Sequence, residues 1–259
     1  MRIATWNING IKARLEVVKL WLEQHKPDVV GLQEIKSIDE NFPREAFEDL
    51  GYNVETFGQK SWNGVALLSR TPFEEVHRGL PGDESDEQAR LIEGVFSTST
   101  GIVRVCNIYL PNGNPVDSEK FPYKLAWMDR LNAFVAQRLL LEEPFVLMGD
   151  FNLIPTPLDC HDPKAWWGDA LYREESLEKF RTLSNMGMTD ALRSVSDAPA
   201  YTFWDFQSGA WRKDNGIRID HLMLSPQAAD HLSGVTIHRD TRGWDKPSDH
   251  VPVEGSFGF

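Results

Sequence analysis

The fold is indicated most directly by the stretch Phe145-Val146-Leu147-Met148-Gly149-Asp150-Phe151-Asn152. Its apolar first half predicts a buried β-strand, because short apolar runs that end at a glycine are typical of strands. Gly149 allows the backbone to approach another group closely. Asp150 and Asn152 lie two residues apart, so both side chains would face the same way. An Asx turn leading into Pro155 explains the same residues, and the stretch alone does not decide between the two interpretations.

Polar side chains also stand at the ends of other apolar segments. Glu34 lies in the run Val29–Ile35, and Asp220 lies inside the run Gly216–Leu224. Each carboxylate has an ordinary structural explanation, such as a salt bridge at the strand end. His250 could likewise be a structural histidine satisfied within the core. Their conjunction is the stronger signal. The polar side chains at or near strand ends are Asn7, Asn9, Glu34, Asp150, Asn152, Asp220, Asp249 and His250.

These residue types fit one kind of chemistry. Carboxylate and carboxamide oxygens are hard ligands, which suit Mg²⁺ or Mn²⁺. The chain has too few Cys and His clusters for a dedicated zinc site. It has neither a GxxxxGK phosphate loop nor a GxSxG nucleophile elbow. A hard metal beside carboxylates and one histidine is typical of phosphate-ester hydrolysis by an activated water.

Strand and helix signals mix along the chain without strict alternation. Helices packed outside two facing sheets would give a layered α/β architecture. No flexible linker divides the chain, so we expect residues 1–259 to form a single catalytic domain. Helical spacing predicts helices at Ile11–His25, at Ser118–Leu141 with Ser118 as N-cap, and at Leu177–Met186. Apolar or alternating segments predict strands at Ile3–Ile8, Asp28–Ile35, Gly64–Ser69, Leu91–Phe96, Ile102–Leu110, Phe145–Asn152, Ile217–Ser225, Val235–Arg239 and Val251–Phe257.

Composition restricts the class of protein. With 27 basic and 39 acidic side chains among 259 residues, the formal charge is −12. This charge argues against a protein held on nucleic acid by bulk charge alone, but not against a nucleic-acid enzyme. Cys106 and Cys160 are too few for a disulfide scaffold and suit a reducing compartment. No signal peptide is evident and no apolar run reaches the roughly 18 residues of a membrane span, so the cytoplasm is the expected location, with no membrane contact.

Six segments together resemble the signatures of exonuclease III-type AP endonucleases, which belong to the endonuclease/exonuclease/phosphatase superfamily. They run in the family's order from residue 5 to residue 250, so the resemblance covers nearly the whole chain. Any one motif is weak, but the ordered set is specific. Asn63-Gly64-Val65-Ala66 and Arg90 also fit. The six segments are Thr5-Trp6-Asn7-Ile8-Asn9-Gly10, Leu32-Gln33-Glu34-Ile35-Lys36, Asn107-Ile108-Tyr109-Leu110-Pro111-Asn112-Gly113, Gly149-Asp150-Phe151-Asn152, Arg218-Ile219-Asp220-His221 and Ser248-Asp249-His250.

The resemblance implies both a fold and an activity. The implied fold is a four-layered α/β-sandwich, in which two facing mixed sheets are flanked by helices and the site lies at one end of the sheets. The implied activity is that of a Mg²⁺- or Mn²⁺-dependent DNA repair nuclease. Such an enzyme incises double-stranded DNA 5′ to an abasic site and has 3′-to-5′ exonuclease and 3′-phosphatase or phosphodiesterase activity. We therefore expect abasic or 3′-blocked DNA as the substrate, and a monomeric enzyme.

The resemblance also implies a role for individual residues. Glu34 would be the principal metal ligand, supported by Asn7 and Asp249, with Asp150 and Asn152 as further candidate ligands. Asp150, oriented by Asn152, would position or deprotonate the attacking water. The remaining catalytic assignments are His250 as hydrogen-bond donor to a phosphate oxygen, Asp220 as the group that orients it, and Tyr109 as a contact to the scissile phosphate.

Candidate DNA contacts are less sharply defined. Trp211 follows Ser208-Gly209 in a segment of loop-like composition, and the family has an apolar aromatic at the matching place. The residue would act as a wedge in a DNA groove or as a wall of an abasic-sugar pocket, with core packing as the alternative. A single Lys or Arg is more often a solvated surface charge. The candidate phosphate and DNA contacts are Asn112, Arg90, Lys124, Trp211 and Arg212, with Lys12, Arg14, Lys120, Arg218 and Arg242 as further cations.

The sequence departs from typical family members between Leu158 and Ser176, which in the family lies near the abasic pocket. This departure leaves open a 3′-end-trimming enzyme with little abasic-site incision. Another phosphoesterase of the same superfamily would keep the catalytic residues but lack the aromatic and basic loop after Trp204. A catalytically inactive DNA-binding regulator is a different class of protein. It is disfavoured because such proteins lose the acids that this chain retains.

Overall fold

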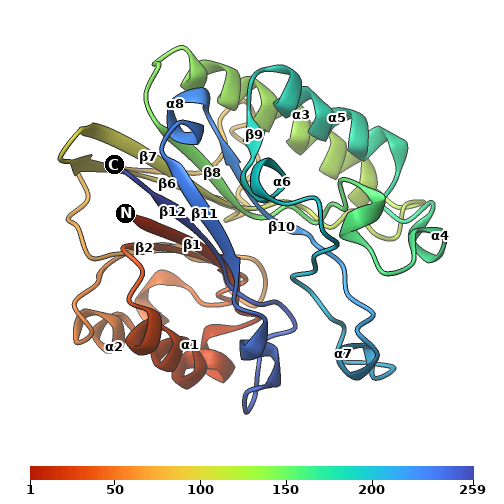
Figure 1. The fold of residues 1–259 in the computed structure, drawn as a ribbon, viewed down its shortest axis with the longest axis horizontal. Helices are drawn as coiled ribbons and strands as arrows, with labels where there is room; N and C mark the ends of the chain where they lie inside the picture. Colours follow the sequence, from red (N-terminus) through yellow and green to blue (C-terminus); the bar gives the residue numbers. More distant parts are fainter.

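The computed structural model describes residues 1–259 and contains two six-stranded sheets that face each other, with helices on both outer sides (Figure 1). The first sheet consists of β1 (Arg2–Asn7), β2 (Val29–Gln33), β3 (Asn53–Phe57), β4 (Val65–Ser69), β11 (Leu232–Ile237) and β12 (Val253–Phe257), in the order β11-β12-β1-β2-β4-β3. The second consists of β5 (Glu75–Arg78), β6 (Leu91–Thr98), β7 (Gly101–Tyr109), β8 (Phe145–Asp150), β9 (Thr189–Asp190) and β10 (Asp220–Leu224), in the order β5-β6-β7-β8-β10-β9.

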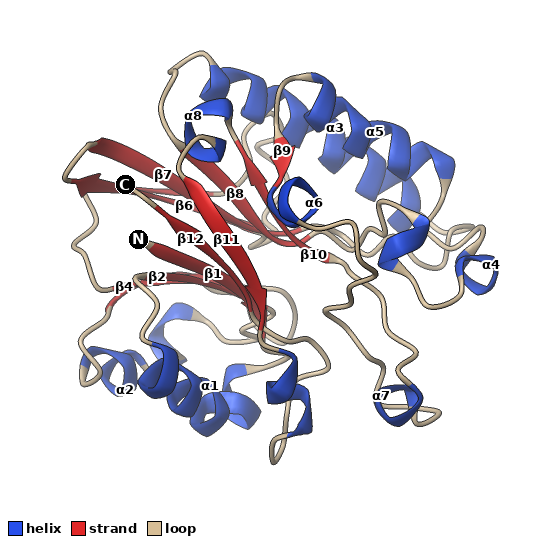
Figure 2. Cartoon of the chain, viewed as in Figure 1, coloured by secondary structure: helices blue, strands red, loops and turns tan.

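Helices cover the outer face of each sheet (Figure 2). The first sheet is covered by α1 (Ile11–His25) and α2 (Arg44–Glu48), and the second by α3 (Lys120–Leu139) and α5 (Glu174–Asn185). The short helices are α4 (Pro163–Trp166), α6 (Ala191–Val195), α7 (Ala210–Lys213) and α8 (Pro226–Ala229), with 3₁₀ turns at Asp39–Asn41, Pro157–Asp159 and Arg239–Gly243. None of these helices combines the length and apolar character that a membrane crossing requires.

The four-layered sandwich predicted from the sequence is confirmed. Each predicted strand overlaps an observed one, but β3, β5 and β9 were not predicted. These three lie at sheet edges, where part of each strand is exposed and the side chains form no apolar run. The prediction of Ser118 as a helix N-cap was wrong. Helix α3 begins at Lys120 after Glu119, and the Ser118 hydroxyl donates instead to the carbonyl of Pro115 at 2.6 Å.

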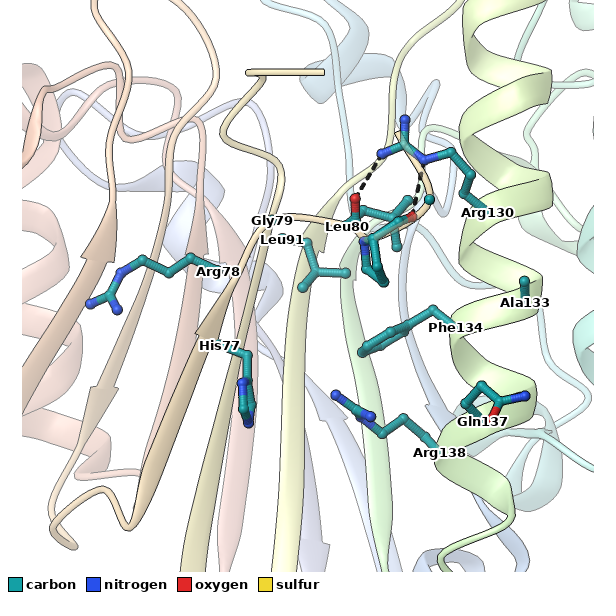
Figure 3. Close-up of a pocket in the computed structure, with 12 residues that line it drawn as sticks. His77, Arg78, Gly79, Leu80, Leu91, Arg130, Ala133, Phe134, Gln137 and Arg138 are labelled. Carbon is teal, nitrogen blue, oxygen red and sulfur yellow. Dashed lines mark hydrogen bonds between the residues drawn. The ribbon is translucent and has the colours of Figure 1, made fainter. Parts of the chain in front are cut away.

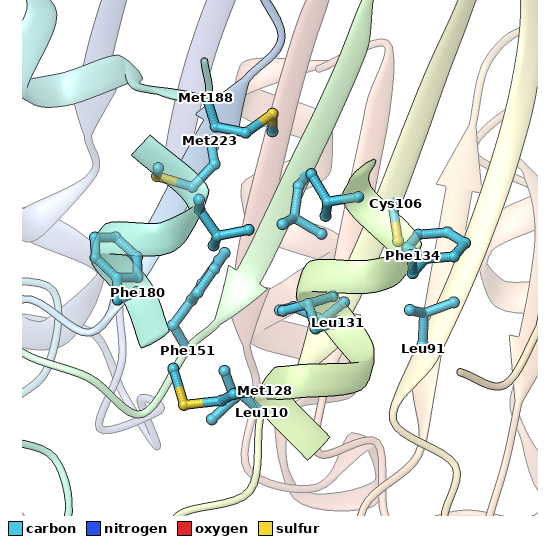
Figure 4. Packing of buried hydrophobic residues seen from close by; sticks show 14 of the residues in the cluster. Leu91, Cys106, Leu110, Met128, Leu131, Phe134, Phe151, Phe180, Met188 and Met223 are labelled. Carbon is cyan, nitrogen blue, oxygen red and sulfur yellow. The ribbon is translucent and has the colours of Figure 1, made fainter. Parts of the chain in front are cut away.

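Three apolar layers hold the sandwich together. One lies between the sheets and includes Val105 and Val146, and a second joins α1 to the first sheet. The third is formed where α3 and α5 pack on the second sheet, with Leu131, Phe151 and Phe180 among its members (Figure 4). Burial of this kind contributes roughly 25 cal/mol for each Å² of apolar surface removed from water. The helices therefore fix the second sheet firmly on its outer side.

Strand directions bring the polar strand ends together. β1 runs parallel to β2, and β7 runs parallel to β8, so within each pair the carboxyl ends lie at the same edge. β10 runs antiparallel to β8 and places Asp220 opposite Asp150, while β7 places Tyr109 beside Asp150. The loops that carry α4 and α7 project from the same side of the molecule as the end of β1 (Figure 1). This end of the sandwich is where the candidate site is found.

Candidate active site

A glycine brings the Asp150 backbone into the centre of the site. Gly149 has φ +150°, and a Cβ at this position would lie 2.0 Å from the carbonyl oxygen of Ile108. Any larger residue would therefore push β8 away from β7. Asp150 follows at once, with only 1% of its surface exposed. The close backbone approach expected at Gly149 is present, and it fixes the carboxylate beside the ends of β7 and β10.

A single amide group links the two sheets at the site. The side-chain amide nitrogen of Asn7 donates to Oε1 of Glu34 at 2.9 Å and to Oδ2 of Asp150 at 2.9 Å. Asn7 comes from β1 and Glu34 directly follows β2, whereas Asp150 ends β8. Two carboxylates therefore converge on one point between the sheets. Like charges this close are costly unless a cation or fixed donors compensate them.

His250 is held by a second carboxylate. Its Nδ1 atom lies 2.9 Å from Oδ2 of Asp220, which also accepts a 2.6 Å hydrogen bond from the Thr202 hydroxyl. The Nε2 atom of His250 lies 3.8 Å from Oδ2 of Asp150. That distance is too long for a hydrogen bond, so the Nε2 proton is available to a third group. Asp220 thus orients the imidazole and fixes which ring nitrogen faces Asp150.

Asn152 joins the loop after β8 to the loop after β7. Its backbone N–H donates to Oδ1 of Asp150 at 2.8 Å, and its side-chain amide donates to the Leu110 carbonyl at 2.8 Å. The amide of Asn112 in turn donates to Oδ1 of Asn152 at 3.0 Å. The predicted neighbours Asp150, Asn152 and Asn112 are therefore one connected group. Asn112 is exposed and marks the side from which solvent reaches the group.

Non-glycine residues with left-handed backbone gather at this end of the sandwich. Asn9, Glu34, Lys36 and Asn152 have φ angles of 47°, 51°, 50° and 44°. Such conformations cost roughly 1–3 kcal/mol each and persist only where the surroundings enforce them. At Glu34 the Gly10 N–H donates to the backbone carbonyl, and Lys36 Nζ lies 3.0 Å from Oε2 of the side chain. These four residues therefore hold costly backbone conformations at or next to the site.

The carboxyl groups of Asp150 and Glu34 have pKa values shifted in opposite directions. Burial and the neighbouring Asp220 raise the pKa of Asp150, although His250 opposes the shift. Burial disfavours the charged form of His250, but Asp220 and Asp150 outweigh burial and raise the pKa of the imidazole. Burial also opposes ionisation of Glu34, yet the hydrogen bond from Asn7 and the charge of Lys36 lower the pKa of this carboxyl. Glu34 therefore stays ionised, whereas Asp150 binds a proton more readily.

Tyr109 is kept as a protonated donor. Burial, together with the carboxylates Glu34 and Asp150, raises the pKa of its phenol well above the usual value. The guanidinium of Arg90 stacks over the ring at 4.9 Å and donates to the Tyr109 carbonyl at 3.0 Å. Tyr109 therefore presents a neutral hydroxyl beside the carboxylates, which suits a hydrogen bond to an anionic oxygen.

The donor set fits a hard divalent cation. Glu34 and Asp150 both approach the Asn7 amide, and all their ligand atoms are oxygens. Among acids and histidines, the group whose ligand atoms lie within 4.8 Å of one another is Asp150, Asp220 and His250. Asp249, an expected ligand, accepts a 3.2 Å hydrogen bond from Asn9 and is partly exposed. The two cysteines are buried and are absent from these contacts.

A hollow of about 640 Å³ opens at the candidate site beside Tyr109 and Asn112. It is lined by the expected contacts Arg90, Tyr109 and Asn112, together with Lys120 and the exposed ring of Trp62. Trp62 is 71% exposed, and it was not among the contacts predicted from the sequence. Its signal was present in the sequence, because a tryptophan next to the family-like segment at Asn63 stands between polar residues. A large exposed ring beside cations is the composition expected of a nucleic-acid contact.

Three cations expected at a DNA surface are buried instead. Lys124 is fully buried, and its Nζ donates to the carbonyls of Asn152 at 2.6 Å and Asn112 at 3.1 Å. Arg218 is 1% exposed and pairs with Asp159 and Asp190. The expectation that Lys124 and Arg218 contact phosphates directly was wrong, because the charged groups of both side chains are buried. The third is Arg242, which is 7% exposed and donates to the carbonyl of Trp204.

Trp211 occupies a short helix rather than the expected loop. It lies in α7, and its ring packs edge-on against the buried Trp204 with centroids 5.0 Å apart. The guanidinium of Arg239 lies 5.0 Å from the same ring. Trp211 is therefore half-buried, with packing partners of its own. Arg212, the next residue, is exposed as expected.

A separate hollow of about 570 Å³ lies between α3 and the loop around Leu80 (Figure 3). Arg130 crosses its upper edge and donates to the carbonyls of Leu80 and Pro81, while Arg138 pairs with the buried Glu93. None of the predicted catalytic or metal-binding residues lines this hollow. It therefore lies apart from the candidate active site.

An α/β sandwich with carboxylates, a carboxylate-bound histidine and oxygen ligands at one end is the arrangement expected of a phosphoester hydrolase. Residues 4–250 match the Endonuclease/Exonuclease/phosphatase family. The chain belongs to this family, and it is a hydrolase of the exodeoxyribonuclease III type.

Relatives of known identity cover the whole chain. Exodeoxyribonuclease III of Haemophilus influenzae is 35% identical over 99% of this chain and 100% of its own length. A variant of the 3′ phosphatase NExo from Neisseria, solved bound to product DNA hairpin, superposes with a TM-score of 0.96 at 37% identity and full coverage of both chains. An AP endonuclease from Archaeoglobus fulgidus superposes with a TM-score of 0.94 at 33% identity, again over both full chains.

Proposed function

We propose that this enzyme is a metal-dependent DNA repair nuclease that hydrolyses phosphodiesters 5′ to abasic sites and phosphoesters at 3′ ends. The observation that carries the proposal is the pairing of Asp150 with His250 across a 3.8 Å gap, beside the hollow lined by Arg90 and Tyr109. A base and a proton donor held 3.8 Å apart suit attack of water on a phosphorus atom. The Neisseria and Archaeoglobus proteins are named for the two activities, and both names support the proposal.

Each group at the site has a task in this proposal. Asp150, with its raised pKa, accepts the proton of the attacking water on a carboxylate oxygen. His250 donates from Nε2 to a phosphate oxygen, and Asp220 holds its Nδ1–H so that the ring cannot turn. Tyr109 donates its hydroxyl to another phosphate oxygen. These fixed donors compensate the charge that develops on phosphorus-bound oxygens.

Glu34 and Asn7 would hold Mg²⁺ or Mn²⁺, with Asp249 as a third ligand and Asp150 or Asn152 as further candidates. A bound divalent cation at this place supplies charge stabilisation for the phosphate oxygens. The lowered pKa of Glu34 supports this role, because a ligand must stay ionised to keep the cation.

We further propose that the enzyme works as a monomer in the cytoplasm, with residues 1–259 as one catalytic domain. Asn7 and His250 contribute to the same site, which supports a single unit. Cys106 and Cys160 are free and buried, in agreement with a reducing compartment. Because the net charge is −12, DNA must bind to a local basic face. The candidates for this face are Arg90, Lys120 and the exposed Arg212.

A second candidate is a 3′-end-trimming enzyme with little abasic-site incision. Trp167 favours it: this ring is 78% exposed in the segment Leu158–Ser176, which departs from the family's typical sequence. A bulky exposed ring in this segment would change how DNA binds without altering the catalytic residues.

One gel assay tests both candidates. Three duplexes are compared: one with an abasic site, one with a recessed 3′ hydroxyl and one with a 3′-terminal phosphate, each in Mg²⁺, Mn²⁺ or EDTA. We expect cleavage of all three with either metal and none in EDTA. Removal of the 3′ phosphate without abasic incision would select the second candidate. Activity that persists in EDTA, or hydrolysis of a small phosphate ester alone, would contradict the proposed function.

A further inference from the structure

Lys124 is a buried cation that the proposed mechanism does not use. It lies on α3, one turn after the exposed Lys120, and none of its surface reaches solvent. An unpaired buried charge is costly, so a lysine persists in such a place only when its donors are satisfied. The two acceptors of Lys124 are backbone carbonyls of Asn112 and Asn152, at 3.1 and 2.6 Å. Both residues belong to the candidate active site.

The two carbonyls come from different loops. Asn112 lies in the loop after β7, and Asn152 lies in the loop after β8. Their side chains meet in a 3.0 Å hydrogen bond, and the Asn152 N–H holds Oδ1 of Asp150 at 2.8 Å. Lys124 therefore stands directly behind the residue that orients the proposed base. Asn152 has φ 44°, and the ammonium bound to its carbonyl helps to maintain this costly conformation.

A third segment lies close to the same side chain, because the charge of Asp169 acts on Lys124. A Cβ placed on Gly113 would lie 2.7 Å from Cδ of Lys124 and 3.1 Å from Cβ of Ala170. Asn114 ties this segment further, because its amide donates to Asp169 at 3.0 Å and its Oδ1 accepts from the Ala170 N–H at 3.2 Å. Lys124 thus lies where the Asn112 loop, the Asn152 loop and the divergent segment Leu158–Ser176 come together.

We propose that Lys124 is a positioning residue, which sets the distance between the Asn112 and Asn152 loops and thereby aligns Asp150 with the phosphate contacts. It acts through the two loops and does not touch DNA. Both the ammonium and the neutral amine carry the two N–H groups that these carbonyls require, so the role does not depend on the protonation state. The inference rests on the proposed phosphodiester hydrolysis.

The test compares Lys124→Met with Lys120→Met in the full chain, using the duplex with a 3′-terminal phosphate. Methionine matches the length of lysine and removes the donors, so Lys124→Met should lower kcat at least about tenfold, as expected when a catalytic group is misplaced. Its KM and the salt dependence of its DNA binding should stay near those of wild type, and its melting temperature should fall by only a few degrees, because two buried carbonyls lose their donors. Lys120→Met should do the reverse, raising KM and flattening the salt slope by roughly one unit.

Three results would overturn the positioning role. The first is a kcat of Lys124→Met within twofold of wild type. The second is a melting temperature more than about 10 °C lower with kcat and KM changed together, which would make the lysine a structural residue only. The third is a salt slope flattened as in Lys120→Met, which would make it a DNA contact. A wild-type enzyme that hydrolyses no DNA would instead defeat the proposed function, so the two failures are distinguishable.

Discussion

The two sheets contribute unlike halves to the proposed active site. Asp150 and Asp220, from the second sheet, are each 1% exposed and bound by fixed protein donors. Glu34 and Asp249, from the side of the first sheet, are partly exposed, and their partners Lys36 and Asn9 are themselves partly exposed. In the half from the second sheet, protein donors hold the buried carboxylates. In the half from the first sheet, the carboxylate oxygens remain accessible to solvent.

This difference separates two requirements of the reaction. A group that takes a proton from water benefits from burial, because burial raises the pKa of a carboxyl group. A group that holds a divalent cation must stay ionised and reachable. The raised pKa of Asp150 and the lowered pKa of Glu34 follow this division. Substitutions in the two halves should therefore respond differently to added metal.

The largest effect is expected in the buried half. Asp150→Asn keeps the shape but removes the proposed base, so kcat should fall by at least about a hundredfold. Added Mg²⁺ should not restore it, since the lost function is proton transfer. Single-turnover cleavage of the duplex with a 3′ phosphate measures the rate, and fluorescence anisotropy checks that DNA affinity changes little. Turnover within a few-fold of wild type would remove Asp150 from its role.

A smaller and metal-dependent effect is expected in the open half. Glu34→Gln removes the charge that would hold the cation, so activity at low Mg²⁺ should be lost and should return in part as Mg²⁺ is raised. A titration of rate against Mg²⁺ for wild type and variant measures the shift. Asp150→Asn is the matched control, because its residual rate should need no more Mg²⁺ than that of wild type. An unchanged Mg²⁺ requirement would erase the distinction between the two halves.

The contrast between open and buried extends to the aromatic residues. Trp62 is exposed, so Trp62→Ala should raise the KM for DNA roughly fivefold or more without changing the melting temperature. Trp211→Ala removes a ring that packs against Trp204, so it should lower the melting temperature by a few degrees as well as reduce activity. Thermal unfolding and steady-state kinetics on abasic DNA measure both. An equal loss of stability in the two variants would contradict the assignment.

The smallest effect concerns the acid stability of the buried half. Burial, reinforced by the charge of Arg218, lowers the pKa of His221 to about 4. An unfolded histidine titrates near about 6.5, so the unfolded chain takes up a proton first as the pH falls. Stability should therefore decrease from about pH 6.5 towards pH 4, by about 2 kcal/mol at pH 5 from this group. In His221→Gln, the difference between the unfolding free energies at pH 7 and pH 5 should be smaller than in wild type by this amount. An unchanged difference would show that His221 does not cause the loss of stability in acid.

The parts of the fold that the sequence predicts are those with a uniform environment. β8 is buried on both faces, so its apolar run is visible in the sequence, and the polar residues that follow it stand out. The edge strands β3 and β5 have mixed exposure and give no such pattern. Likewise, Asn7 and Asp220 were noticed because they are polar among apolar neighbours. The sequence assigns no role to the hydrogen-bond donors Thr202 and Lys36, because their positions beside Asp220 and Glu34 depend on the folded structure.

Exposure of a single large or charged side chain is the property that sequence reasoning could not supply. Lys124 and Lys120 are both lysines on one helix, yet one is buried behind the site and the other faces solvent. The same holds for Trp62 and Trp211. Local composition describes the chain neighbours of a residue, whereas exposure depends on segments that are distant in sequence, such as the Arg239 turn that packs on Trp211.

The pairing of β1 with β12 has a consequence for the order of synthesis. Asn7 and His250 belong to one site, and the strands beside them pair antiparallel, so the earliest and latest parts of the chain meet there. A ribosome that adds about 5–20 residues per second makes Glu34 roughly ten to forty seconds before Asp249. During this interval Glu34 can already meet Asn7 and Lys36, but the segments that carry Asp150 and His250 have not all been made, so the growing polypeptide has no complete site. A degradative enzyme built in this way stays inert beside the nucleic acid that encodes it until its last strand arrives.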